Sequence, residues 1–150
     1  MGNCSAGADG PIGEEWDVSR VTDMERIFYQ ANSFNADVSK WDVSRVTNMG
    51  YMFEEASSFN MDLSKWDVSR VTNMVMMFAH ANSFNMDLSK WDVSRASSVY
   101  NMFMHASSFQ QTLCGKAWVN SNAFKRRIFY GSPGKISTTV CGLCVPLTLF

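Results

Sequence analysis

The sequence lacks features that several classes of protein require. No run of about eighteen apolar residues occurs, so we expect no helix that spans a membrane. Neither charge is in excess, because 13 Lys and Arg stand against 14 Asp and Glu, and the net charge of −1 excludes binding to nucleic acid or anionic lipid through total charge. No G-x-S-x-G, phosphate-binding glycine loop or carboxylate pair outside the repeats described below is present. We therefore expect no enzyme, no cofactor and no metal site.

The sequence does contain enough apolar residues for one folded domain, and they recur at a fixed interval. The chain has 150 residues, of which 46% are apolar and 18% charged. The segment W-D-V-S-R begins at Trp16, Trp41, Trp66 and Trp91, which is a strict 25-residue period. Three copies of the unit are complete, and the fourth continues through Phe109. A period without insertions predicts that the copies stack as a solenoid.

Each unit contains two patterns of apolar residues. Trp66 and Val68 alternate with polar residues, which is typical of a short half-buried strand. Spacings of three and four residues then predict an amphipathic helix, with Thr72 as its cap, along Val71, Met74, Met77, Phe78 and Ala81. We therefore predict an α/β repeat with one short parallel strand and one short helix in each 25-residue coil.

The repeats divide the chain into three parts. Residues 1–12 are expected to be a leader or a truncated N-terminal cap without the apolar core of a signal peptide, and residues 13–112 an array of four coils. Residues 113–150 are expected to form a C-terminal cap with an apolar tail, in which residues 124–130 resemble residues 24–29 with one residue inserted. Cys114 and Cys141 bracket the cap, and we expect them to form a disulfide, which implies an oxidising compartment. The roles of Cys4 and Cys144 stay open.

The unit W-D-V-S-x-V-T-N-M-x-x-M-F-x-x-A-x-S-F-N resembles the repeat of BspA-like leucine-rich-repeat surface proteins, which occur in bacteria and in microbial eukaryotes including algae. The similarity covers roughly residues 10–109. It implies a right-handed, leucine-rich-repeat-like solenoid with a parallel sheet on one face. It also implies a role in binding or adhesion, commonly at a cell surface, without a catalytic centre.

Stacking turns each repeated residue into a column, and two charged columns are the candidate binding face. Aspartates and lysines are expected to lie side by side on the sheet face, either as a self-neutralising solvated lattice or as a polar grid that meets a partner. The residues are Asp17, Asp42, Asp67, Asp92, Lys40, Lys65 and Lys90. Another column contains Gln30, Glu55, His80 and His105, and we expect its histidines to be exposed and without a metal.

The sequence therefore predicts a non-catalytic interaction or scaffold module that binds a protein or, as the second ligand class, a glycan. The alternative is a small accessory subunit bound permanently in a larger assembly, possibly at a membrane. The expected disulfide favours a secreted, cell-surface or other oxidising location.

Overall fold

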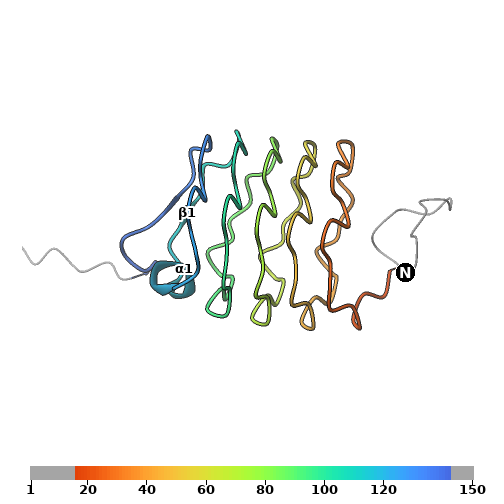
Figure 1. The fold of residues 1–150 in the computed structure, drawn as a ribbon, viewed down its shortest axis with the longest axis horizontal. Helices are drawn as coiled ribbons and strands as arrows, with labels where there is room; N and C mark the ends of the chain where they lie inside the picture. The colour runs from red at the N-terminus through yellow and green to blue at the C-terminus, as the bar shows by residue number, and fades with distance from the viewer. Residues whose placement is uncertain (1–15, 143–150) are drawn as a thin grey trace, which may run out of the picture.

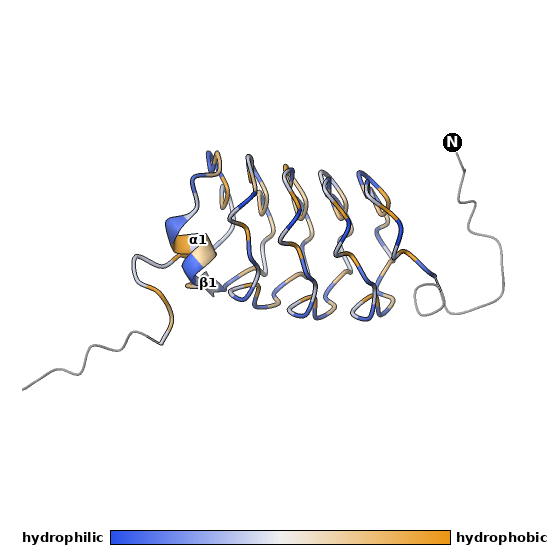
Figure 2. Cartoon of the chain, turned by 90° about the horizontal axis from the view of Figure 1, so that it is seen from below, coloured by the Kyte–Doolittle hydropathy of each residue, from blue (hydrophilic) through white to orange (hydrophobic). Residues whose placement is uncertain are grey.

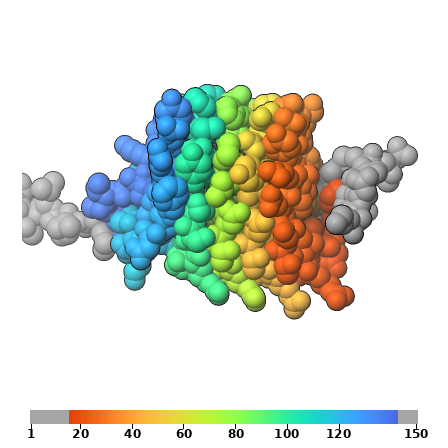
Figure 3. Space-filling model, viewed as in Figure 1, coloured from red at the N-terminus to blue at the C-terminus, as the bar shows by residue number. Residues whose placement is uncertain are grey.

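Residues 16–142, which the computed structural model describes, form a row of coils that lie side by side. Figure 1 shows the coils following one another along the longest axis, with α1 in the last of them. In the space-filling view each coil is a continuous band that touches the next (Figure 3). We number the coils 1 to 5; they comprise residues 16–40, 41–65, 66–90, 91–115 and 116–136.

Regular secondary structure is short and lies at the C-terminal end of the row. Strand β1 (Thr112–Leu113) precedes helix α1 (Lys116–Asn120), and strand β2 (Lys135–Ile136) follows it. The two strands pair in parallel, with Leu113 opposite Ile136. None of the helices in the described part of the chain is long and apolar enough to cross a membrane.

The coils are held in register by hydrogen bonds between equivalent positions. Isolated parallel bridges join one position in each coil to the same position in the next, along Asp23, Asn48, Asn73, Ser98 and Phe124. The offset between bridged positions equals the repeat period in the first four coils, and it is longer by a single residue between the last two. The segment 124–130 thus corresponds to residues 23–29, and the extra residue that the sequence predicted within it lies instead between Ser98 and Phe124.

The segment of each coil that was predicted to be helical forms a ladder between coils instead. In coil 3, four N–H groups donate to carbonyl oxygens of coil 4 at 2.8 to 3.1 Å, those of Met74, Met76, Phe78 and His80. The N–H groups of Met77, Ala79 and Ala81, which alternate with the last of these, donate to carbonyls three residues back, and the Val75 N–H donates to Asn73 Oδ1. An α-helix would need these same donors for carbonyls four residues back. The helix predicted over residues 71–81 is therefore not formed, and α1 is the only helix between residues 16 and 142.

Backbone conformation gives the local reason for this difference. Met76 and His80 have φ values of 52° and 58°, in the left-handed region that an α-helix does not use. Each is the third residue of a turn closed by an N–H that donates to the carbonyl three residues back, which is the geometry of a type II turn. Consecutive turns repeat inward positions every three or four residues, so their apolar spacing matches that of a helix.

The strand predicted at Trp66 and Val68 is likewise not formed. The Trp66 N–H donates to the Leu63 carbonyl, and the Val68 carbonyl accepts from the Val71 N–H, so local turns use these groups. Thr72 caps no helix; its hydroxyl donates to the Thr47 carbonyl of the preceding coil at 3.1 Å. The inward positions of the unit are nevertheless buried as predicted.

Aromatic columns form the core. Figure 2 shows that hydrophobic residues recur in each successive coil. One column of phenyl rings runs through all five coils with centroids 5.4 to 5.6 Å apart, along Phe28, Phe53, Phe78, Phe103 and Phe129. A second column has spacings of 5.8 to 6.0 Å, along Phe34, Phe59, Phe84 and Phe109. Stacking fixes each coil directly over its neighbour.

The tryptophans form a further column at the start of each coil. Trp16 stacks on Trp41 at 6.1 Å, and Trp66 on Trp91 at 6.5 Å, which confirms the predicted stacking of these indole rings. Buried indole N–H groups also tie neighbouring coils together, since Trp91 Nε1 donates to the Leu63 carbonyl at 2.8 Å. In coil 5, Trp118 donates in the same way to the Leu88 carbonyl, so it takes the place of the repeat tryptophan.

Candidate interaction surface

The predicted aspartate column lies on the surface of successive coils, and each aspartate also holds the backbone turn that follows it. Its four carboxylates are exposed. In each, Oδ1 accepts the backbone N–H of the serine two residues later at 3.0 to 3.1 Å, in the pairs Asp17–Ser19, Asp42–Ser44, Asp67–Ser69 and Asp92–Ser94. The D-V-S sequence is well suited to this Asx turn, because a short carboxylate reaches the backbone two residues ahead. The orientation of each carboxylate is therefore fixed by its own coil.

A second aspartate column, which the sequence analysis did not identify, has the same construction. Asp37, Asp62 and Asp87 are exposed and accept the N–H groups of Ser39, Ser64 and Ser89 at 2.8 to 2.9 Å. The signal was present, because D-V-S-K and D-L-S-K repeat the D-x-S spacing of D-V-S-R. Coils 1 to 3 thus each present two fixed carboxylates, and coil 4 presents one.

In three aspartates of the first column, Asp17, Asp42 and Asp92, the turns also favour the ionised form of the carboxyl group. Hydrogen bonds from Ser44, first from its side chain and then from its backbone, lower the pKa of Asp42, and Arg45 adds an electrostatic attraction. Bonds from Ser19 and Ser94 lower the pKa values of Asp17 and Asp92 in the same order. These carboxylates therefore remain ionised at neutral pH.

The lysine column is exposed as expected, and it lies nearest to the second aspartate column. Lys65 and Lys90 both lower the pKa of Asp62 electrostatically. The attraction on Asp42 comes instead from Arg45, one of a further exposed column that comprises Arg20, Arg45, Arg70 and Arg95. In the described residues the single ion pair is Glu25 with Arg26 at 3.4 Å, so the charged columns are not closed by contacts with one another.

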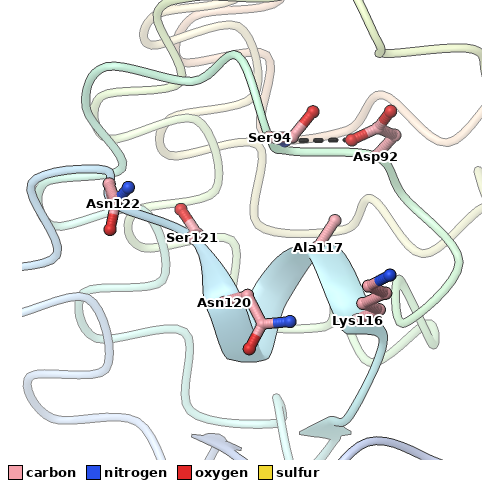
Figure 4. A pocket seen from close by; sticks show the side chains of 7 residues that line it. All are labelled: Asp92, Ser94, Lys116, Ala117, Asn120, Ser121 and Asn122. Carbon is pink, nitrogen blue, oxygen red and sulfur yellow. Dashed lines mark hydrogen bonds between the residues drawn. The ribbon is translucent and has the colours of Figure 1, made fainter.

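A polar pocket lies where this surface meets coil 5 (Figure 4). It has a volume of about 460 Å³, and its walls come from the last Asx turn and from α1 with the residues after it. Figure 4 shows Asp92 and Ser94 on one side, and Lys116, Ala117 and Asn120 of α1 on the other. The remaining lining residues are Ser121 and Asn122. Carboxylate, ammonium and amide groups in one hollow can bind a polar ligand by hydrogen bonds.

The column of Gln30, Glu55, His80 and His105 lies at backbone positions with left-handed φ values in successive coils. Its two histidine rings are closer together than side chains on neighbouring packed helices would be. The His80 and His105 rings are 5.1 Å apart, and His105 meets the Tyr130 ring edge-on at 5.3 Å. Earlier in the same column, Gln30 Nε2 donates to Glu55 Oε2 at 3.2 Å. Between residues 16 and 142, no group of three or more His, Cys, Asp or Glu side chains is placed to hold a metal ion.

Cys114 and Cys141 lie at disulfide distance, with their Cα atoms 5.0 Å apart. The Cys141 N–H also donates to the Cys114 carbonyl at 2.8 Å. The bridge joins the end of coil 4 to the residues that follow coil 5. Cys4, Cys144, the expected leader over residues 1–12 and the end of the apolar tail lie outside the described residues.

Comparison with known protein families gave a match. A family model described as "Mycoplasma protein of unknown function, DUF285" matches residues 2–118. No curated protein and no solved structure matches the chain.

Proposed function

Because the chain belongs to this DUF285 family, we propose its function from its surface: a non-catalytic interaction or scaffold module that binds a protein partner, with a glycan as the second ligand class. The observation that carries the proposal is the exposed array of carboxylates, each held by an Asx turn of its own coil. The backbone bonds of these turns all go to Oδ1, and the carboxylates stay exposed, so each can accept further hydrogen bonds from a partner. Preorganised groups bind with a smaller loss of conformational entropy than mobile side chains.

We further propose that the fold is a right-handed, leucine-rich-repeat-like solenoid of the BspA-like kind. Two features support this assignment. The hydrogen-bonded register retains the repeat period in the first four coils, and the leucine, tryptophan and valine at the junction of coils 3 and 4 point inward, since Leu88, Trp91 and Val93 have exposures of 0 to 1%. A cell-surface or other oxidising location is proposed from the Cys114–Cys141 pair.

The test compares variants that change charge without changing the turns. Asparagine keeps the oxygen that accepts the serine N–H, whereas it removes the negative charge. One triple variant carries D42N, D67N and D92N, and a second carries K40Q, K65Q and K90Q. A matched control alters exposed serines whose hydroxyls make no hydrogen bond within the described residues: S33A, S58A and S83A.

Each protein is immobilised and offered surface proteins of the source cells and a printed panel of neutral and acidic glycans. We expect a ligand of the native chain whose binding weakens by about tenfold or more in the aspartate or lysine variant and stays unchanged in the control. A protein ligand supports the first ligand class and a glycan the second. Equal binding by all four proteins, or no ligand for any, would refute the proposed surface.

The second candidate function is an accessory subunit within a larger assembly. The observation that favours it is the exposure of large apolar side chains at both ends of the row, among them Trp16 at 42% and Phe124 at 54%. Recovery of the chain from its source cells in one complex of fixed composition, stable to high salt, would support this function. Recovery of the free chain alone would exclude it.

A further inference from the structure

In the ladder segment, residues 24–30 of coil 1 and their equivalents, the hydrogen bonds between coils all point the same way, whereas bonds beside it, such as Thr47 N–H to the Thr22 carbonyl at 2.8 Å, run toward the preceding coil. N–H groups of one coil donate to carbonyls of the next coil toward the C-terminus, from Met24 to Asn48 at 2.9 Å and from Met49 to Asn73 at 2.9 Å. The same direction is kept at the last interface, where the Phe103 N–H donates to the Ile128 carbonyl at 2.9 Å. A ladder of uniform direction leaves acceptors at its first coil and donors at its last.

These end groups have no partner within residues 16–142. The acceptors are the carbonyls of coil 1 at positions equivalent to those used in coils 2 to 5: Asp23, Glu25, Ile27 and Tyr29. The donors are the N–H groups of coil 5 at positions equivalent to those used in coils 1 to 4: Lys125, Arg127, Phe129 and Gly131. Open backbone groups at the edge of a hydrogen-bonded array are a template for pairing with another chain. Along the ladder segment the row of acceptors on coil 1 is complementary to the row of donors on coil 5, and neither row is complementary to itself.

Apolar side chains at the two ends of the row are also more exposed than their equivalents in the interior coils. Ile27 in coil 1 is 42% exposed, whereas its equivalents Met52, Met77 and Met102 are completely buried because a preceding coil covers them. At the opposite end, Phe129 is the last ring of the long phenyl column and is only partly buried. Another coil placed before coil 1 would cover Ile27, and one placed after coil 5 would cover Phe129.

One column carries opposite charges at its two ends. It begins with Glu25, continues through the uncharged Gly50, Val75 and Tyr100, and ends with Arg126. If the ladder continued from coil 5 of one copy to coil 1 of another, Arg126 would lie next to Glu25 at about the strand spacing of 4.8 Å. The adjacent column ends in arginine at both ends, but each guanidinium lies over a ring of its own chain, Arg26 over Tyr51 and Arg127 over Tyr130.

We propose that coil 5 of one copy of this chain docks head to tail on coil 1 of a second copy, so that the ladder continues from one copy into the next. The contact combines the open N–H and carbonyl rows, the Phe129 and Phe28 rings and the Arg126–Glu25 charge pair. It is heterologous and leaves one free end of each kind on every assembly. Such a contact therefore extends into a linear stack instead of closing into a dimer.

The experiment is sedimentation velocity on the full 150-residue chain over a wide range of concentration at low and high salt. We expect the mean mass to rise continuously with concentration beyond that of a dimer, and the association to weaken at high salt because the charged pair is exposed. A monomer at every concentration would overturn the proposal and assign the open edges to a different partner. A mass that stops at two copies would also overturn it, because that behaviour requires an isologous contact.

Charge reversal at the two ends tests the register of the contact. E25R and R126E should each weaken the association constant about tenfold, since an attraction is replaced by a repulsion of similar size. The double variant E25R/R126E should restore it, because the pair is then reversed in sign but still complementary. R45E is the matched control, since Arg45 is exposed in the interior of the row.

Folding is checked for each variant by circular dichroism. Arg126 is exposed and makes no ion pair or side-chain hydrogen bond within the described residues, so we expect R126E to fold. If E25R does not fold, the association constant of R126E compared with that of R45E still tests the contact. The same loss of association in R45E as in R126E, or no recovery in the double variant when both single variants are folded, would overturn the proposed contact.

Discussion

Replacing Phe53 by alanine tests whether the stacked phenyl column holds the coils together. Phe53 is completely buried in coil 2. Stacked phenyl rings of the column lie on both sides of it, Phe28 at 5.4 Å and Phe78 at 5.5 Å, and the Phe59 ring lies at 4.0 Å. Because the rigid neighbouring rings cannot fill the space, the substitution leaves a cavity. We expect the free energy of unfolding to fall by about 3–5 kcal/mol.

Phe28 supplies a matched comparison at the end of the same column. It is 6% exposed and has a phenyl ring of the column on one side only within the described residues. One stacked pair contributes about 0.5–1.5 kcal/mol beyond the buried area, so F28A should destabilise the chain less than F53A by at least that amount. Urea denaturation followed by circular dichroism measures both values. A loss below about 1 kcal/mol for F53A, or an equal loss for the two variants, would refute the argument from columns.

Three further predictions concern other contacts of the core and its end. W91F removes the indole N–H that donates to the buried Leu63 carbonyl, although that carbonyl still accepts the Trp66 N–H. The substitution should lower the free energy of unfolding, measured by urea denaturation, by about 1–2 kcal/mol. Reduction of the Cys114–Cys141 disulfide should lower the free energy of unfolding by up to about 3–4 kcal/mol. A C114S/C141S variant, which cannot form the bridge, should unfold at the same urea concentration as the reduced chain. Burial, and then the nearby Glu55 carboxylate, raise the pKa of Glu54 above its value in the unfolded chain. The folded chain therefore favours protonated Glu54, and its free energy of unfolding falls as the pH rises through the folded pKa and the side chain ionises. E54Q should therefore stabilise the chain at neutral pH, and the gain should vanish when the pH falls below the pKa of the unfolded glutamate; an equal gain at both pH values would contradict this.

The sequence predicted the order and register of the coils because these depend on repeated side chains. A tryptophan at one position and phenylalanines at two positions of every repeat can be buried together only if the coils lie directly over one another. The same argument correctly placed Leu88, Trp91 and Val93 inside. It also placed the aspartates and lysines outside, but it overlooked the Asx turns, although D-x-S occurs twice in every complete unit.

The local backbone was predicted incorrectly because apolar spacing reports which residues face inward and says nothing of where the N–H groups bond. Turns of three and four residues place Met74, Met77 and Phe78 inward as a helix would. The continuation of the array into coil 5 was only partly visible in the sequence. Trp118 is displaced from the repeat register by the residues of α1, so its equivalence to Trp91 appears only in its hydrogen bond to Leu88.

The spacing of the aromatic columns explains why the backbone forms a ladder instead of helices. Helices that pack side by side have axes about 8–10 Å apart, whereas hydrogen-bonded strands lie about 4.8 Å apart. Phe53 and Phe78 have ring centroids 5.5 Å apart, which direct backbone hydrogen bonds between coils permit and packed helices do not. A sequence that places phenylalanine over phenylalanine in each coil therefore requires its N–H groups to bond to the next coil. Since an α-helix satisfies its donors internally and this ladder satisfies them between coils, the same stacking that forms the core leaves open donors and acceptors at its two ends.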